Sequence, residues 1–188
     1  MDGIAEARMS KAIDDLKQEH DVILSSLQIL DKFSADVSEG TAPAKIDLLN
    51  FVGFLKEFAD NCHHGKEEKI LFPALVEAGF SQHAGPIKVM LAEHLQGRDY
   101  MKQMDLAISS GPDYLTFAYA ARNYSSLLKN HIKKENDVLF PMAESTVDSA
   151  RLEKISEAFD EYEEKVIARG RHEELQQLLN ELRLKYLK

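Results

Sequence analysis

Residues 63–73 of the chain read HHGKEEKILFP, and residues 131–141 read HIKKENDVLFP. Each stretch begins with a histidine, carries a glutamate four residues later and ends in Leu-Phe-Pro. Side chains four residues apart lie on adjacent turns of one helix face. The two stretches therefore predict two helices that each present a His-x-x-x-Glu pair on one side.

Two further histidines extend this repeat. His20 and His94 each follow a glutamate and precede one of the two His-x-x-x-Glu stretches. The chain thus reads as two helical hairpins, each supplying one lone histidine and then one His-x-x-x-Glu pair. Antiparallel packing of two such hairpins creates a pseudo-twofold axis. Two equivalent metal positions are expected to follow from that axis.

Apolar residues recur at helical spacing along most of the chain, without the alternation that is typical of strands. This spacing predicts a first helix from about Ser10, as its N-cap, to about Val37. Pro43 is expected in the first turn of a second helix, which should end near Gly79.

The second half of the chain gives the same signals. A third helix is predicted to begin near Pro86 and to end at the turn of residues 109–113, where Pro112 is expected to open a fourth. From about Asp148 the pattern predicts two further helices, broken at Gly170.

These helices predict an all-α fold: an antiparallel up-down four-helix bundle with a C-terminal helical extension. We expect residues 1–147 to form the bundle. Residues 148–188 carry no chemical motif and are interpreted as a packing or dimerisation element. The predicted inner face of the second helix comprises Leu48, Val52, Leu55, Ala59, His63, Glu67, Ile70 and Ala74. That of the fourth helix comprises Phe117, Ala121, Tyr124, Leu128, His131, Glu135, Val138 and Met142.

Composition excludes several classes of protein. The net charge of -9 over 188 residues argues against nucleic-acid binding, which needs a basic face. No apolar run approaches the roughly 18 residues of a membrane span, and the N-terminal residues lack a signal-peptide pattern. The single cysteine, Cys62, fits a reducing compartment. We therefore expect a cytoplasmic protein without a membrane or nucleic-acid partner.

Polar side chains nevertheless fall on the predicted apolar faces. A buried, unpaired carboxylate costs several kcal/mol. Six polar side chains, four histidines and two glutamates, are spread over the four inner faces and therefore indicate a cation held between them. Four imidazole nitrogens and two bridging carboxylates would give four donor atoms to each of two metals. This donor set suits redox-active iron or manganese better than zinc. We predict two iron ions, joined by an oxo or hydroxo bridge, with an open position at each. The residues concerned are His20, His63, Glu67, His94, His131 and Glu135.

The run from His63 to Pro73, with Gly85-Pro86-Ile87 ahead of Glu93-His94, resembles the hemerythrin HHE cation-binding family over about residues 10–145. The closest pattern within that family is that of bacterial di-iron iron-centre repair proteins, which also end the fourth helix with His-x-x-x-Glu. The resemblance implies which residues are terminal ligands: His20, His63, His94 and His131. It implies that two glutamates bridge the irons: Glu67 and Glu135.

The chain departs from the oxygen-carrying hemerythrins at two positions. Those proteins place a fifth histidine four residues after the third-helix histidine, where this chain has Arg98. They also place an aspartate five residues after the fourth-helix histidine, where this chain has Asn136. Simple reversible oxygen carriage is therefore not the expected function.

Neighbouring residues are given secondary roles. Arg98 is expected one turn beyond His94, within reach of the metals, but a protonated guanidinium cannot ligate them. It is expected to turn to the bundle surface, or to pair with an acidic group or a bound anion. Tyr124 is interpreted as a core residue, with a role beside the metals as the alternative. On a regular α-helix His64 points about 100° away from the preceding histidine, which predicts a surface or supporting position, with a ligand role as the alternative. Glu68 is expected to be solvated.

A nitrogen-rich site with few carboxylates favours binding of dioxygen, nitric oxide or peroxide over hydroxylation chemistry. We predict a non-haem di-iron protein that binds or reacts with such small oxidants, in stress defence or in iron supply. The alternative is a non-catalytic sensor of iron or oxygen, or an interaction module. In that case the C-terminal helices would pass the state of the iron to a partner.

Overall fold

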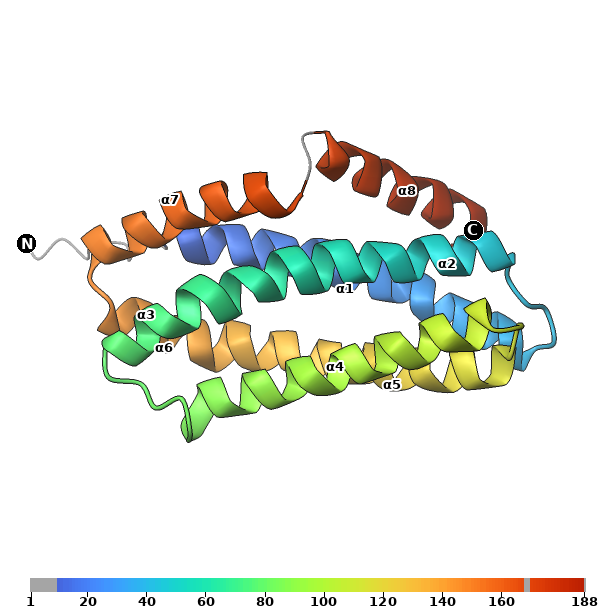
Figure 1. The fold of residues 1–188 in the computed structure, drawn as a ribbon, viewed down its shortest axis with the longest axis horizontal. Coiled ribbons are helices and arrows are strands. Elements are labelled where there is room, and N and C mark those ends of the chain that lie inside the picture. The colour runs from blue at the N-terminus through green and yellow to red at the C-terminus, as the bar shows by residue number, and fades with distance from the viewer. Residues whose placement is uncertain (1–9, 168–169, 188) are drawn as a thin grey trace, which may run out of the picture.

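The computed structural model describes residues 10–167 and 170–187, and these residues form helices and their connections (Figure 1). No strand occurs in the described ranges, so the predicted all-α class is confirmed. Helix α1 spans Lys11–Ser38 and helix α4 spans Gly85–Ser109. Two other long rods are composite, because π-helical stretches (η), in which hydrogen bonds join residues five apart, interrupt the α-helix.

The composite rods carry the two His-x-x-x-Glu stretches. One runs continuously through α2 (Lys45–Phe54), η1 (Leu55–His64), η2 (Glu67–Leu71) and α3 (Phe72–Glu77). The other runs continuously through α5 (Tyr114–Lys134), η3 (Glu135–Leu139) and α6 (Phe140–Thr146).

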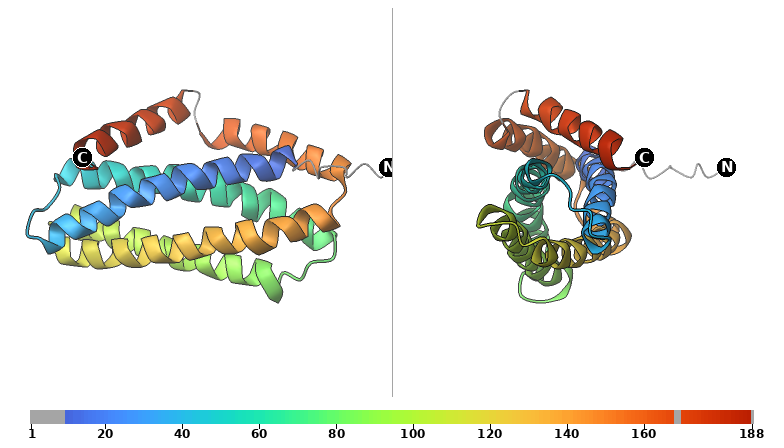
Figure 2. Two further views of the ribbon diagram at one scale, coloured as in Figure 1. Left: turned by 180° about the vertical axis from the view of Figure 1, so that it is seen from behind. Right: turned by 90° about the vertical axis from the view of Figure 1, so that its right-hand side faces the viewer.

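The end-on view in Figure 2 shows these four rods around a common interior, with two more helices on the outside. The outer helices are α7 (Ser149–Val166) and α8 (Arg171–Tyr186). Helix α7 contacts α1, η1 and η2, and α8 contacts α1 and α2. The extension therefore lies along one side of the bundle, over α1 and the first composite rod.

The interior contains two separate apolar clusters, which lie toward opposite ends of the rods. One includes Leu27, Phe51 and Met104, and the other includes Leu16 and Phe140, among other side chains. Along each rod, the predicted histidines and glutamates fall between the stretches that supply the two clusters. The fold thus places the polar residues in the middle of the bundle, with apolar packing on either side.

Capping groups set several helix boundaries where they were predicted. The Ser10 hydroxyl accepts a hydrogen bond from the Ile13 amide at the start of α1, and Pro86 lies in the first turn of α4. The Asp148 carboxylate accepts one from the Arg151 amide at the start of α7. Gly170, at φ +82°, separates α7 from α8 as expected.

Two proline assignments were wrong. Pro43 precedes α2 rather than opening it, because Ala44 is extended (ψ 133°) and the helix begins at Lys45. Pro112 also lies outside its helix. Asp113 is the N-cap of α5, since its carboxylate accepts a hydrogen bond from the Thr116 amide at 3.1 Å.

The π-helical turns change the register of both composite rods just after the glutamates. The Phe72 amide donates to the Glu67 carbonyl, and the Phe140 amide donates to the Glu135 carbonyl. Each bond spans five residues instead of four. A proline follows at once in both rods and offers no N–H to the carbonyl four residues before it.

This change of register explains the errors in the predicted inner faces. Val138 and Met142 were expected to face the core, but they are 47% and 39% exposed. Ile70 is likewise only partly buried. The extra residue in each wide turn buries Leu71 and Leu139 in their place.

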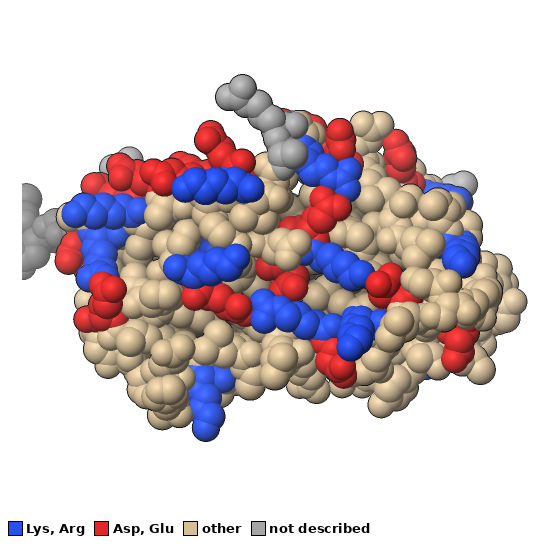
Figure 3. Space-filling model, viewed as in Figure 1, with Lys and Arg blue, Asp and Glu red and all other residues tan. Residues whose placement is uncertain are grey.

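No helix of the described residues combines the length and apolar character needed to cross a membrane. On the face drawn in Figure 3, lysine and arginine side chains alternate with aspartate and glutamate rather than gathering into one basic patch.

Close contacts between α7 and the first composite rod hold the extension against the bundle. The Tyr162 hydroxyl donates to the Asn61 carbonyl at 2.9 Å and accepts from the Lys69 ammonium at 2.8 Å. It lies directly against the α-carbon of Gly65, where a β-carbon would overlap it. The apolar side chains Leu175 and Leu182 of α8 are buried within the chain.

Gly65→Ala should loosen α7, because the new methyl group displaces the Tyr162 hydroxyl from the Asn61 carbonyl. We expect the free energy of unfolding to fall by about 1–2 kcal/mol, and amide exchange in α7 to rise. The matched control is Gly53→Ala in the same rod, where a β-carbon meets nothing within 4 Å. That change should raise the free energy of unfolding by up to about 1 kcal/mol. Equal stabilisation by both changes would show that Tyr162 does not sit against Gly65.

Candidate metal centre

The structure brings the six predicted residues into two adjoining groups that share Glu67. In each group every residue offers one nitrogen or oxygen atom, and these atoms lie within 4.8 Å of one another. All of these residues are buried. The first group is His20, His63, Glu67 and Glu135, and the second is His64, Glu67, His94 and His131. Their role as metal ligands remains a prediction.

Glu135 spans the two groups through one oxygen. Its Oε2 atom lies 3.2 Å from Nε2 of His20 and 3.2 Å from Nε2 of His131. His20 belongs to the first group and His131 to the second. The carboxylate therefore lies where it could contact a cation in either group.

Glu67 spans the groups through both of its oxygens. Its Oε1 lies 3.8 Å from Nε2 of His63, and its Oε2 lies 3.3 Å from Nε2 of His94. In the second group, Nε2 of His94 and Nε2 of His131 are 3.1 Å apart. Ring nitrogens and carboxylate oxygens of both groups thus converge on the interior.

The outer nitrogen of each predicted ligand histidine is held by a polar side chain. Such contacts fix the ring orientation and direct the other nitrogen inward. The four Nδ1 contacts are His20 to Asn136 (2.9 Å), His63 to Glu19 (2.7 Å), His94 to Glu68 (2.7 Å) and His131 to Glu93 (3.0 Å).

Sequence reasoning missed most of these supporting groups. Glu19 and Glu93 each precede a histidine, yet each contacts the histidine of the partner helix in its hairpin. The repeated Glu-His dipeptide was the available signal. The expectation that Glu68 is solvated was wrong, because it accepts hydrogen bonds from His94 and from Arg98.

Most of the inward-facing nitrogen and oxygen atoms of the site have no hydrogen-bond partner within the described chain, which is unusual for buried polar atoms. Buried polar atoms are normally paired, since an unpaired one loses its bonds to water without compensation. The interior here gathers nitrogen and oxygen atoms that could all bind one kind of partner, a cation. The residues present therefore fit a metal centre. The unpaired atoms are Nε2 of His20, His63 and His64, and both carboxylate oxygens of Glu67 and of Glu135.

The charges of the site support the same conclusion. Burial raises the pKa of Glu67, but the surrounding imidazoles, led by His63 and His94, outweigh burial and lower the pKa overall. Burial lowers the pKa of His94, but the nearby carboxylates of Glu67 and Glu68 outweigh burial and raise the pKa to about 9. Glu67 thus remains anionic and attracts positive charge to the interior.

His64 does not lie at the surface, so the first of its two predicted positions was wrong, while the supporting position stays a prediction. Its side chain is 2% exposed and belongs to the second group. The predicted angle of about 100° from His63 assumed an α-helix, whereas η1 has more residues per turn and so less rotation per residue. Adjacent histidines therefore both face inward.

Arg98 and Tyr124 take supporting positions. Arg98 pairs with acidic groups, as one of its predicted alternatives required: Nε donates to Asp60 and Nη2 donates to Glu68, each at 2.8 Å. Tyr124 is fully buried in the larger apolar cluster, and its hydroxyl has no hydrogen-bond partner in the described ranges. This location agrees with its interpretation as a core residue, while a role beside the metals stays untested.

A buried ion-pair network joins the C-terminal extension to the first group. Lys66 is 3% exposed, and its ammonium donates to Glu19 and to Glu163 at 2.5 Å each. Glu19 in turn holds His63, and Glu163 lies 2.9 Å from Nε2 of His172. The extension was predicted to carry no chemical motif and to serve in packing or dimerisation. Glu163 of α7 is in addition linked through Lys66 to Glu19, the carboxylate that holds His63.

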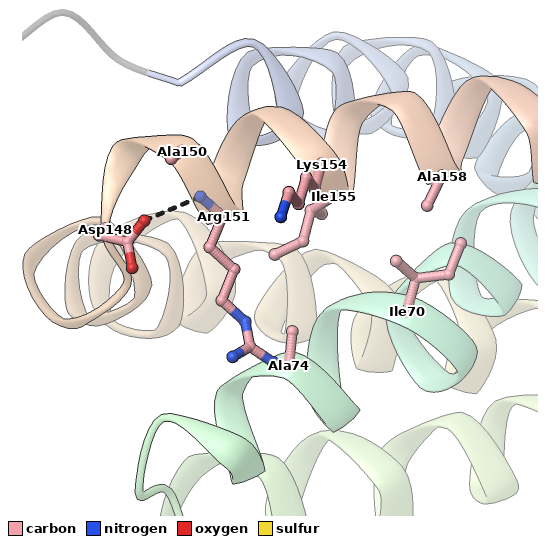
Figure 4. A pocket seen from close by; sticks show the side chains of 8 residues that line it. All are labelled: Ile70, Ala74, Asp148, Ala150, Arg151, Lys154, Ile155 and Ala158. Atoms are coloured by element: carbon pink, nitrogen blue, oxygen red, sulfur yellow. Dashed lines mark hydrogen bonds between the residues drawn. The ribbon is translucent and has the colours of Figure 1, made fainter.

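One open groove on the described part of the surface lies apart from this centre. A groove of about 490 Å³ lies between α7 and the η2–α3 segment (Figure 4). Its lining includes the cations Arg151 and Lys154 but none of the clustered histidines. The candidate centre is enclosed by the helices. The residues that line the groove are Ile70, Ala74, Asp148, Ala150, Arg151, Lys154, Ile155 and Ala158.

Comparisons with known proteins agree with this geometry. The sequence model described as "Hemerythrin HHE cation binding domain" matches residues 11–143. The chain is 35% identical over 88 residues to the iron-sulfur cluster repair protein YtfE of Cronobacter sakazakii, and 36% identical over 88 residues to that of Salmonella newport. Each match covers 43% of this chain and 40% of the relative. No solved structure gives a significant match.

Glu67→Ala and Glu135→Ala should each lower metal affinity at least about tenfold, because each removes a donor shared by the two groups. The free energy of unfolding of the metal-free protein should fall by less than about 2 kcal/mol, or rise, since a buried carboxylate is removed. Asp137→Ala, an exposed carboxylate in η3, is the matched control and should leave affinity unchanged. Metal titration and urea unfolding measure the two effects. Equal destabilisation with and without metal would indicate a structural role instead.

Glu163→Gln should weaken docking of the extension, because Lys66 then keeps only one anionic partner. Glu163 is partly exposed, so we expect a loss of about 1–2 kcal/mol in the free energy of unfolding. Faster amide exchange in α7 and α8 should accompany it. Glu164→Gln changes the exposed neighbouring carboxylate and should have little effect. If both variants behave alike, the network does not hold the extension.

Proposed function

We propose that this chain, which belongs to the hemerythrin HHE cation-binding family, is a non-haem di-iron protein that binds or reacts with small oxidants. One observation carries the proposal: the buried, unpaired nitrogen and oxygen atoms that converge between the two apolar clusters. The proposal includes an antiparallel up-down arrangement of the four rods, with residues 148–188 as an extension of the bundle.

The proposed ligand roles follow the two groups. His20 and His63 would hold one iron, and His94 and His131 would hold the other. Glu67 and Glu135 would contact both, since each has oxygen atoms facing ring nitrogens of the two groups. When bound, the iron pair supplies redox chemistry and open positions for dioxygen, nitric oxide or peroxide.

The protein's own residues prepare the site for this chemistry. The carboxylates Glu19, Glu68 and Glu93 accept from the outer nitrogens, which makes the inner nitrogens better donors and fixes their direction. The apolar clusters on either side exclude bulk water. A small, neutral molecule fits this enclosed interior better than a large or charged substrate.

The compared relatives suggest a physiological setting. The proteins of Cronobacter and Salmonella are named for iron-sulfur cluster repair, and the matched segment spans about two fifths of their length. We propose that this chain likewise acts in oxidative or nitrosative stress, by consuming the oxidant or by supplying iron. A reducing cytoplasm suits this proposal, because it would keep the buried Cys62 as a thiol.

The contacts of the extension favour a second function, that of a sensor. Lys66 links Glu163 of α7 to the carboxylate that holds His63, so a change at the metals could alter how α7 and α8 dock. A partner protein, or a second copy of the chain, would then read the position of these helices. Homodimerisation through the extension remains part of this alternative.

Anaerobic loading with ferrous iron should give two irons per chain, measured by metal analysis after removal of unbound iron. Addition of nitric oxide or hydrogen peroxide should then change the optical spectrum, and peroxide should be consumed if the protein turns it over. Asp137→Ala serves as the competent control, and the double variant Glu67→Ala/Glu135→Ala as the metal-deficient one. Binding of one metal per chain, or preference for zinc over iron, would contradict the di-iron proposal.

The sensor function makes a different prediction for the same loaded protein. Metal loading should change amide exchange in α7 and α8, and Glu163→Gln should abolish that change while two irons stay bound. Turnover of oxidant with no change in the extension favours the oxidant-handling function. A change in the extension without turnover favours the sensor.

A further inference from the structure

His64 has the surroundings of a ligand, although the sequence repeat gives it no counterpart. The second His-x-x-x-Glu stretch has Ile132 at the equivalent position, so the pseudo-twofold relation does not predict a histidine there. In the structure, His64 is as deeply buried as the predicted ligands. One of its ring nitrogens lies within 4.8 Å of donor atoms of Glu67, His94 and His131. Its Nε2 atom is buried and has no hydrogen-bond partner in the described residues.

The orientation of His64 repeats that of the other site histidines. Its Nδ1 atom lies 3.4 Å from a carboxylate oxygen of Asp60, and its Nε2 atom is buried without a partner in the described residues. This is the arrangement in which metal-binding histidines are normally found, with the outer nitrogen held by an acidic side chain. His64 differs from its neighbours only in the greater length of that outer contact.

Arg98 also supports this arrangement, because it holds the carboxylates behind two of the histidines. Its guanidinium holds both Asp60 and Glu68, at 2.8 Å each. These are the carboxylates that face the outer nitrogens of His64 and His94. Arg98 therefore positions the partners of two histidines in the same group, on adjacent helices of the bundle.

A purely space-filling role does not account for His64. Its ring stacks on His94, with centroids 3.9 Å apart and an interplanar angle of 19°, which an apolar ring could do equally well. A phenyl ring in this position would bury no unpaired nitrogen. An imidazole there leaves Nε2 without a partner in the interior, unless that atom binds a further group.

We propose that Nε2 of His64 is a fifth nitrogen ligand of the centre, acting on the metal held by His94 and His131. The inference rests on the proposed di-iron function and adds to its ligand set. It makes the two metal positions unequal, with three histidines at one and two at the other. The first position therefore keeps more room for an external ligand than the second does.

The proposed ligand role of His64 also bears on the departure from the family pattern at Arg98. The oxygen-carrying members of the family that the sequence resembles place their additional histidine where this chain has Arg98. Here a histidine on the first composite rod belongs to the same group as His94, and Arg98 fixes the aspartate behind it. In the proposed ligand set, η1 rather than α4 supplies the additional nitrogen.

His64→Phe tests the proposal, because it keeps a stacking ring and removes both nitrogens. Wild type and variant are titrated anaerobically with ferrous iron enriched in ⁵⁷Fe, and Mössbauer spectra are recorded at two irons per chain. Wild type should show two distinct iron environments in equal amounts. In the variant, affinity at one position should fall at least about tenfold, and the spectrum of that iron alone should change. His64→Gln, which is closer in polarity, should show the same loss if the Phe variant folds poorly.

His83→Gln is the matched control, since His83 is an exposed loop histidine and should leave both iron environments unchanged. A crystal structure of the iron-loaded wild type should place Nε2 of His64 within about 2.3 Å of one metal. The inference is overturned if wild type binds two irons and both His64 variants bind them with unchanged affinity and spectra. Failure of wild type itself to bind two irons would instead refute the proposed function.

Discussion

Unpaired polar atoms in the middle of the bundle impose the constraint on which the rest of the structure depends. Two buried glutamates and the inner nitrogens of three histidines lack hydrogen-bond partners in the described residues. Such a set is costly in an apolar interior unless a cation neutralises it. The two apolar clusters lie on either side of this set, so each rod must supply hydrophobic side chains at both ends and polar ones between them.

The π-helical stretches show how the backbone meets this constraint. They occur where the composite rods carry their ligand candidates, at η1, η2 and η3. A wider turn changes which neighbours share a face, and it allows His63 and His64 to point inward together. The energetic cost of the poorer backbone geometry is offset by the packing of the side chains that the turn redirects, such as Leu71 and Leu139.

The supporting carboxylates connect the centre to the outside of the fold. Glu19 and Glu93 act within their own hairpins, whereas Arg98 fixes two carboxylates at once. Lys66 extends the network to Glu163 in the C-terminal extension. An ammonium buried this deeply needs anionic partners, so the extension is tied to the bundle by charge as well as by apolar packing.

The sequence by itself determined the helical class, the helix boundaries at Ser10 and Asp148, and the six side chains that meet in the interior. It could do so because apolar spacing and a repeated His-x-x-x-Glu pattern are local properties of a helix. Only the tertiary structure decided that His64 faces inward and that Lys66 pairs with the extension. Both depend on distant contacts and on π-helical turns, whose register departs from the 3.6-residue period by which a sequence is read.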